Sequence, residues 1–172
     1  IRVIGEAEVG DPSASRITGT LQDISTDKRA EETLRIQART DPLTGLMNRD
    51  AVLNELAERL ADESRATVAV LYIDLDRFKT VNDVLGHNAG DELLMQAAAR
   101  IQRAVGAGGQ VARFGGDEFL VVCDAGANQE LPVQLAEAVL AAFNESFRFG
   151  KDEFAITTSI GLACAPDDGL RP

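Results

Sequence analysis

The chain has 172 residues, a length typical of one ordinary domain. It carries 28 acidic and 17 basic residues, a formal net charge of −11, which argues against a nucleic-acid binder because phosphate backbones require clustered Lys and Arg. A nucleotide substrate stays possible, since a bound metal ion can reverse the local sign of the field. Hydrophobic residues make up 45% of the chain, enough for a packed core, and no apolar run approaches the roughly 18 residues that span a bilayer.

The two cysteines indicate the compartment. Cys123 and Cys164 match neither a disulfide scaffold nor a CxxC metal or redox motif. The first eleven residues are mixed and acidic, unlike a signal peptide. We therefore predict reduced core cysteines in a cytoplasmic protein.

The first 24 residues contain two stretches in which apolar and polar residues alternate, separated by the turn-rich residues 10–13. This pattern predicts two strands joined by a loop. Because two strands alone cannot bury a core, we expect residues 1–25 to be the end of a larger domain.

Residues 26–40 follow as a charged, helix-favouring stretch. Ser25 or Thr26 would cap the helix, and Ala30, Leu34 and Ala38 form one narrow apolar stripe. The stripe has two interpretations. It suits a solvated connector helix, and it also suits the seam of a two-stranded coiled coil that holds two copies together.

The rest of the chain alternates helical and strand patterns. Helices are predicted over residues 48–62, 76–85, 91–105 and 131–143, and strands over 67–75, 110–114, 119–123, 147–149 and 154–165. The mixed order, with hairpins, predicts an α+β fold. We expect a central mixed, mainly antiparallel β-sheet flanked by helices and preceded by the connector helix.

Acidic residues stand at two places in this pattern. Asp74 and Asp76 end the apolar run of residues 67–75, where they would serve either as ligands or as helix-capping acids. The second place is the sequence Gly115-Gly116-Asp117-Glu118 between two predicted strands. By itself it is compatible with an ordinary type I′ turn, but its two acids would repel each other without a cation. Carboxylate oxygens are the ligands that Mg²⁺ prefers, so we expect Asp74 and Asp117 to face one ion.

Between these acids lie residues suited to a nucleotide. The first turn of the helix after Asp76 would offer backbone N–H groups to phosphates, and Lys79 would add positive charge. Asn82 and Asp91 have the side chains that recognise guanine, since a carboxylate accepts from its N1–H and exocyclic amine.

Several motifs in order carry a resemblance to a known family. Residues 113–119 read RFGGDEF, residues 41–49 read DPLTGLMNR, and residues 74–79 read DLDRFK, followed by Asn82-Asp83, Gly86-His87 and Gly90-Asp91. The chain resembles the GGDEF diguanylate cyclases, which join two GTP molecules into cyclic di-GMP. The resemblance implies their nucleotidyl-cyclase, palm-like fold over roughly 130 residues.

The resemblance also implies roles for individual residues. Asp74, Asp117 and the Leu75 backbone carbonyl would bind Mg²⁺ or Mn²⁺. Glu118 would lie near the ribose 3′-hydroxyl, and Asp117 or Glu118 would assist its deprotonation. The remaining contacts to GTP would come from Phe78, Lys79, Asn82, Asp91, Gly115 and Gly116. Each domain would hold one GTP, so catalysis would need two copies face to face. The alternative is a catalytically silent GTP-binding domain that controls a neighbouring domain, such as an EAL phosphodiesterase.

The resemblance implies limits for the domains, and the chain departs from the family's pattern at two places. Residues 19–25 and 27–31 resemble the exit of a PAS sensor domain, so residues 1–25 would be a PAS fragment, 26–40 a signalling helix, and 41–172 the GGDEF domain. The family's C-terminal helix with phosphate-contacting basic residues would follow Pro172. Gly106 and Gly109 stand where the family's product-inhibition motif has Arg and Asp, which predicts no inhibitory site.

Overall fold

The computed structural model describes residues 2–8, 16–22, 38–62, 67–125, 130–150 and 152–169. The chain divides into two units, Ile1–Ala38 and Arg39–Pro172. Strands β1 (Arg2–Glu8) and β2 (Arg16–Gln22) of the first unit pair antiparallel, which confirms the two predicted strands. The helix predicted within residues 26–40 lies outside the described residues except at residues 38–40, of which Ala38 and Arg39 are helical.

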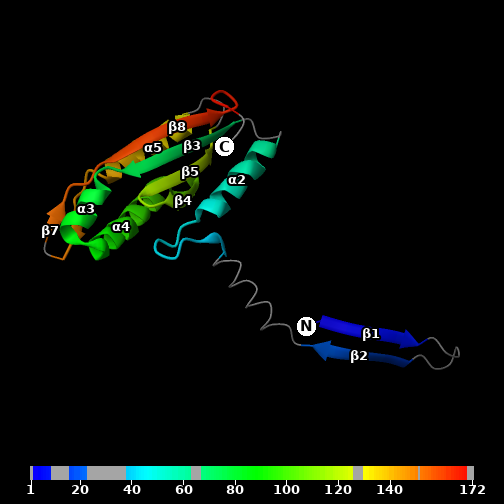
Figure 1. Cartoon of the computed structure of the whole chain (residues 1–172). Helices are drawn as coiled ribbons and strands as arrows, with labels where there is room; N and C mark the ends of the chain where they lie inside the picture. The colour runs from blue at the N-terminus through cyan, green and yellow to red at the C-terminus, as the bar shows by residue number, and fades with distance from the viewer. Residues whose placement is uncertain are drawn as a thin grey trace. The chain divides into compact units, whose positions relative to one another are not determined.

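The second unit is built around a four-stranded antiparallel sheet with the order β4-β5-β3-β8 (Figure 1). Its strands are β3 (Val68–Leu75), β4 (Gln110–Gly115), β5 (Glu118–Asp124) and β8 (Thr158–Ala165). The apolar run predicted as a central strand is β3, which pairs on both edges. One parallel bridge joins Met47 to Ala112. The predicted α+β class and mainly antiparallel sheet are confirmed.

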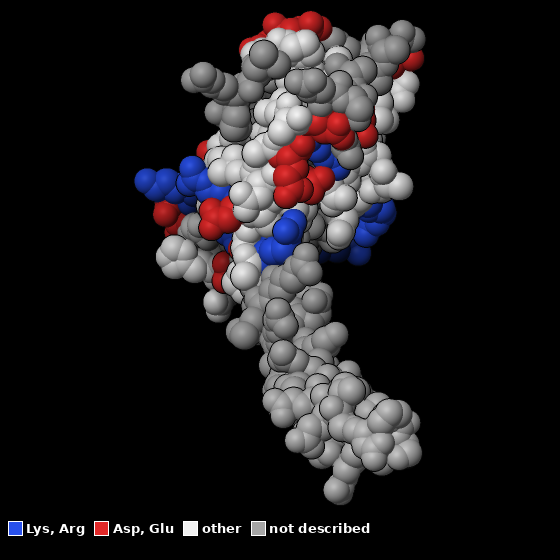
Figure 2. Space-filling view, turned by 90° about the vertical axis from the view of Figure 1, so that its right-hand side faces the viewer, with Lys and Arg blue, Asp and Glu red and all other residues white. Residues whose placement is uncertain are grey.

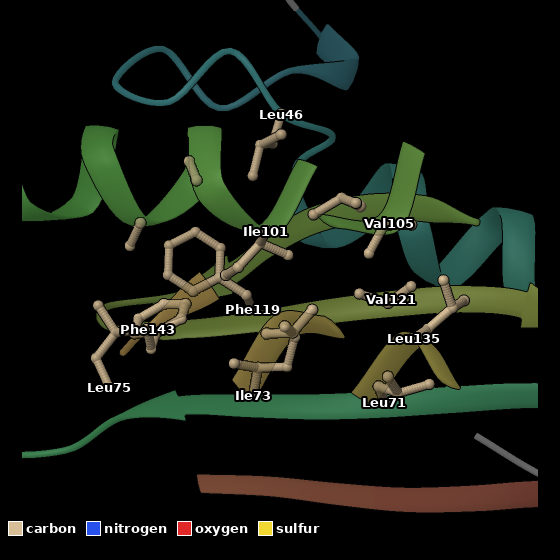
Figure 3. Close-up of a cluster of buried hydrophobic side chains, with 14 of the residues drawn as sticks. Leu46, Leu71, Ile73, Leu75, Ile101, Val105, Phe119, Val121, Leu135 and Phe143 are labelled. Atoms are coloured by element: carbon tan, nitrogen blue, oxygen red, sulfur yellow. The ribbon is translucent and has the colours of Figure 1, made fainter. Parts of the chain in front are cut away.

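Helices cover both faces of this sheet. They are α2 (Arg49–Ala61), α3 (Phe78–Leu85), α4 (His87–Val105) and α5 (Glu130–Ala142). The larger core cluster joins one sheet face to α4 and α5, and Figure 3 shows Ile73, Ile101 and Phe119 meeting in it. The smaller cluster joins the other face to α2 through Val52 and Leu56. Across the described ranges, no helix is long and apolar enough to cross a membrane.

Two helix boundaries differ from prediction. Helix α3 begins at Phe78 rather than Asp76, because Arg77 adopts a left-handed conformation with φ of 62° and ends the preceding turn. Helix α4 begins at His87, four residues before the predicted start. Its first turn contains Asn88 and Gly90, whose low helix propensity hides the helix in the sequence. Gly86, predicted to end the first of these helices, is its C-cap with φ of 86°.

The strand predicted over residues 154–165 is in fact two strands. Strand β7 (Asp152–Phe154) pairs with β6 (Phe147–Phe149) as a separate hairpin, and β8 joins the central sheet. Residues 155–157 between them have no regular structure. The apolar pattern runs through this break because Ile156 is buried in the core and looks like part of a strand.

Candidate active site

Three acidic residues lie at one end of the central sheet. The register of β3 and β5 places Asp74 directly opposite Glu118, so both side chains lie on the same face. Asp117 precedes Glu118 in the turn of the β4–β5 hairpin, and its carbonyl accepts a hydrogen bond from the Leu75 N–H at 3.3 Å. The antiparallel pairing therefore brings together acids that are more than 40 residues apart in the chain.

These acids repel one another. Burial raises the pKa of Asp74, and the charges of Asp117, Glu118 and Asp76 raise it further. Acidic side chains also gather on one face of this unit in the space-filling view (Figure 2). Like charges directly opposite each other in a sheet destabilise it, so this end of the sheet would gain stability from a cation.

The donor set fits magnesium. Asp74, Asp117 and the Leu75 carbonyl would supply only oxygen ligands, as Mg²⁺ prefers. Within the part of the chain that the structure describes, no three His, Cys, Asp or Glu side chains converge closely enough to form a cage by themselves. Mg²⁺ is usually held by one or two carboxylates, with water and substrate phosphate completing its shell, so an incomplete protein shell suits it.

Asp76 has local partners. Its carboxylate accepts hydrogen bonds from Thr157 Oγ1 at 2.6 Å and from Ser159 Oγ at 2.8 Å. These bonds lower the pKa of Asp76 below its usual value. A hollow of about 590 Å³ lies here, lined by Asp74, Asp76, Arg77, Ala155, Ile156 and Thr157. Asp76 is thus fixed as an anion at the rim of the hollow that Asp74 also lines.

The glycine turn is held by an arginine. Gly116 has φ of 50°, a left-handed conformation that favours glycine, whereas Gly115 does not need it. The Arg113 guanidinium donates to the Gly116 carbonyl from Nε at 3.0 Å and from Nη2 at 2.8 Å. Its Nη1 lies 3.3 Å from both carboxylate oxygens of Asp41. The segment that opens the second unit is therefore tied directly to this turn.

The predicted guanine-recognising residues lie together on α3 and α4. The side chain of Asn82 packs so closely against Gly90 that a Cβ atom there would overlap its amide oxygen. Asp91, the next residue on α4, is exposed. At the start of α3, Phe78 packs against the core and Lys79 is exposed. The predicted nucleotide contacts are thus divided between this helix pair and the sheet end.

The two glycines at the expected inhibitory positions lie in and after a short 3-10 turn, Gly106–Gly108. Gly106 has φ of 53°. A Cβ atom at Gly109 would lie 3.0 Å from both the Val122 carbonyl oxygen and Val121 Cγ1. The chain passes so close to β5 here that a side chain at position 109 would require neighbouring atoms of β5 to give way slightly.

Sequence reasoning missed Tyr72 as a member of the site. The Glu118 carboxylate, as hydrogen-bond acceptor and as a negative charge, raises the pKa of Tyr72 to about 12, together with burial and the charge of Asp74. Tyr72 stands two residues before Asp74 on β3, so the two-residue period of a strand already puts both side chains on one face. This two-residue spacing is the sequence signal that could have identified Tyr72.

Comparison with known proteins places the whole second unit in one family. The family described as "Diguanylate cyclase, GGDEF domain" matches residues 38–172. A signaling protein of Caulobacter vibrioides is 41% identical over 152 residues, which are 87% of this chain and 19% of that protein. The cyclic di-GMP phosphodiesterase PdeR of Escherichia coli is 38% identical over 147 residues, 86% of this chain and 22% of PdeR. The chain thus spans about a fifth of the length of these relatives.

A solved structure agrees with this assignment. The coiled coil and GGDEF domain of DgcB from Caulobacter crescentus, crystallised with c-di-GMP, superposes with a TM-score of 0.76 at 28% identity. The alignment covers 86% of this chain and 81% of that one. With its RFGGDEF hairpin facing Asp74 and the family match over residues 38–172, the chain belongs to the GGDEF family of diguanylate cyclase domains.

Proposed function

We propose that this chain condenses two GTP molecules into cyclic di-GMP. In this reaction the 3′-oxygen of each GTP attacks the α-phosphate of the other, and each attack releases pyrophosphate. The observation that carries the proposal is the placement of Asp74 opposite Glu118, next to Asp117. All the acids that the family's chemistry needs are present and share one end of the sheet.

Each acid has a distinct role in the proposal. Asp74, Asp117 and the Leu75 carbonyl would hold Mg²⁺ or Mn²⁺, which when bound neutralises developing charge on the phosphate oxygens. Glu118 would lie near the ribose 3′-hydroxyl and, with Asp117, assist removal of its proton. The register that sets Glu118 opposite Asp74, on the same sheet face as Tyr72, supports this placement of Glu118 at the sheet end.

Substrate recognition would use both helices and the turn. Asn82 and Asp91 would pair with the guanine edge, and the contact of Asn82 with Gly90, the residue before Asp91, supports a shared contact with one base. Lys79 and the backbone near Phe78 would hold phosphates at the start of α3. Gly115 and Gly116, both exposed, would let GTP lie against the hairpin.

Catalysis would also require a second copy of the domain, because each holds one GTP. We assign residues 41–172 to the GGDEF domain, 26–40 to a signalling helix that sets the pairing, and 1–25 to the end of a PAS-like sensor domain. A nucleotide substrate and two unpaired cysteines, both buried, agree with a cytoplasmic location.

A second candidate function is a GTP-binding domain without turnover that regulates a neighbouring domain. The relative PdeR favours this function. It is named as a phosphodiesterase, and the part that matches this chain makes up about a fifth of its length. The intact acids Asp74, Asp117 and Glu118 favour the enzyme.

One experiment separates the two functions. The chain is incubated with GTP and Mg²⁺, and the nucleotides are separated by liquid chromatography, with Asp117→Ala as the control. Cyclic di-GMP from the wild type and none from the variant is the expected result. Calorimetry with a non-hydrolysable GTP analogue runs in parallel. Tight Mg²⁺-dependent binding with no product would support the regulatory function instead.

A further inference from the structure

Tyr72 and Glu118 occupy diagonal positions on the same sheet face. Asp74 lies opposite Glu118, and Tyr72 lies opposite Leu120, in the antiparallel pairing of β3 and β5. Diagonal neighbours are about 7–8 Å apart between backbones, within reach of long and aromatic side chains. The Tyr72 phenol is therefore within reach of the Glu118 carboxylate, which as acceptor and as a charge raises the pKa of Tyr72.

A second aromatic ring packs against the Tyr72 phenol. Phe114, on β4 beyond the intervening strand β5, meets the Tyr72 ring edge-on, with the centroids 5.8 Å apart and an interplanar angle of 67°. The Arg49 guanidinium lies 4.7 Å from the centroid of the Phe114 ring. Arg49 is the first residue of α2, whose N-cap Asn48 accepts a hydrogen bond from the Ala51 N–H at 2.9 Å. An ordered row of side chains therefore runs from α2 to Glu118.

We propose that Tyr72 is a positioning residue for Glu118, fixing its carboxylate toward Asp74 at the sheet end. The inference rests on the proposed cyclase function and adds a residue to it. A hydrogen bond from a neutral donor to a carboxylate is shorter and stronger than one between neutral groups. It restricts Glu118 to one orientation despite the repulsion from Asp74, which would otherwise turn the side chain toward solvent.

A spectroscopic test does not depend on catalysis. Tyr72 is the only tyrosine of the chain, so labelling tyrosine at the ring carbon Cζ with ¹³C gives a single resonance for this residue. Glu118→Gln is expected to shift the resonance, because the charged acceptor is lost. Asp76→Asn is the matched control, since it removes one negative charge at the same sheet end from a carboxylate bound to Thr157 and Ser159. A resonance that moves equally in both variants, or in neither, would overturn the proposal.

The kinetic test uses Tyr72→Phe, which keeps the ring and removes the hydroxyl. We expect kcat to fall about 10-fold, the scale of a lost charge-assisted hydrogen bond, with KM for GTP within about 2-fold. In a Glu118→Gln background, Tyr72→Phe should not lower kcat any further. Phe114→Leu removes the ring contact but keeps the Tyr72 hydroxyl, so it should lower kcat less than Tyr72→Phe does. Circular dichroism melts check that each variant folds.

The outcomes are distinguishable. A Tyr72→Phe variant with wild-type kcat, or with an equal loss when Glu118 is already replaced, would overturn the inference while leaving the cyclase intact. If the wild type forms no cyclic di-GMP, the proposed function fails. The resonance then decides by itself whether Tyr72 holds Glu118.

Discussion

Asp74 shows how a candidate metal ligand weakens the fold that carries it. It is partly buried opposite one acid and close to another, and its pKa is raised by burial and by their charges. A group whose pKa is raised on folding stabilises the protein most below its unfolded pKa of about 3.8, and this stabilisation is lost as the pH rises through the folded pKa.

Replacing Asp74 by Asn should therefore stabilise the metal-free protein at neutral pH. Like charges in opposed strand positions cost about 0.2–1 kcal/mol, so we expect a rise in melting temperature of about 1–4 °C. The gain should disappear near pH 3, where the wild-type carboxyl is protonated. Differential scanning calorimetry in EDTA measures both effects. In Mg²⁺ the wild type should gain stability and the variant should not. Equal responses to Mg²⁺ would argue against Asp74 as a ligand.

The stability that Asp76 contributes should depend on pH in the opposite direction to that of Asp74. Hydrogen bonds from Thr157 and Ser159 lower its pKa, so its contribution is present above pH 3.8 and is lost as the pH falls through the lower, folded pKa. Asp76→Asn should cost about 1 kcal/mol at pH 7 and progressively less toward acid pH. Urea unfolding of both proteins between pH 7 and pH 2.5 tests this. A cost that does not change with pH would mean that the charge of Asp76 is not what the two hydroxyls stabilise.

At the scale of elements, the close contact of α3 and α4 defines the predicted guanine site. Gly90 is buried where the helices meet, and the Asn82 side chain fills the space next to it. A glycine inside a helix costs about 1 kcal/mol relative to alanine. Helix α4 is therefore less stable for having no side chain at position 90.

Gly90→Ala should separate binding from folding. The new methyl group would displace the Asn82 amide, while the gain in helix propensity offsets part of the strain, so we expect a small change in stability. We expect the Kd for GTP to rise about 10-fold, the cost of one lost hydrogen bond to the base. Calorimetric titration measures this, with Asn82→Ala as the comparison. Unchanged affinity in both variants would remove Asn82 from the nucleotide site.

At the scale of the whole molecule, the proposed chemistry requires two domains. Because each domain would hold one GTP, product formation per molecule should rise with protein concentration and level off once dimers predominate. Rates measured over a 100-fold range of concentration, alongside sedimentation velocity, check this. A rate per molecule that does not vary, in a protein that sediments as a monomer throughout, would contradict a two-domain reaction.

Most of the secondary structure followed from local patterns, and the failures have local causes. The helix ending before Gly86 and the buried strand β3 were predictable, because a helix-stop glycine and an uninterrupted apolar run are strong signals. The start of α4 was not, because the residues of its first turn are poor helix formers. The break before β8 was hidden because Ile156 is buried without belonging to a strand.

The sequence by itself determined the family and the residues of the predicted site. The RFGGDEF and DLDRFK motifs are each contiguous in the chain, and the residue type at each position indicates its chemical role. Only the tertiary structure decided which side chains meet. The strand register placed Asp74 against Glu118, and the packing of α4 on α3 placed Gly90 against Asn82. It also brought Arg113 to Asp41 across 72 residues, and Tyr72 to Glu118. Such contacts depend on strand pairing and helix packing between distant segments, and no local pattern encodes the distance between two side chains.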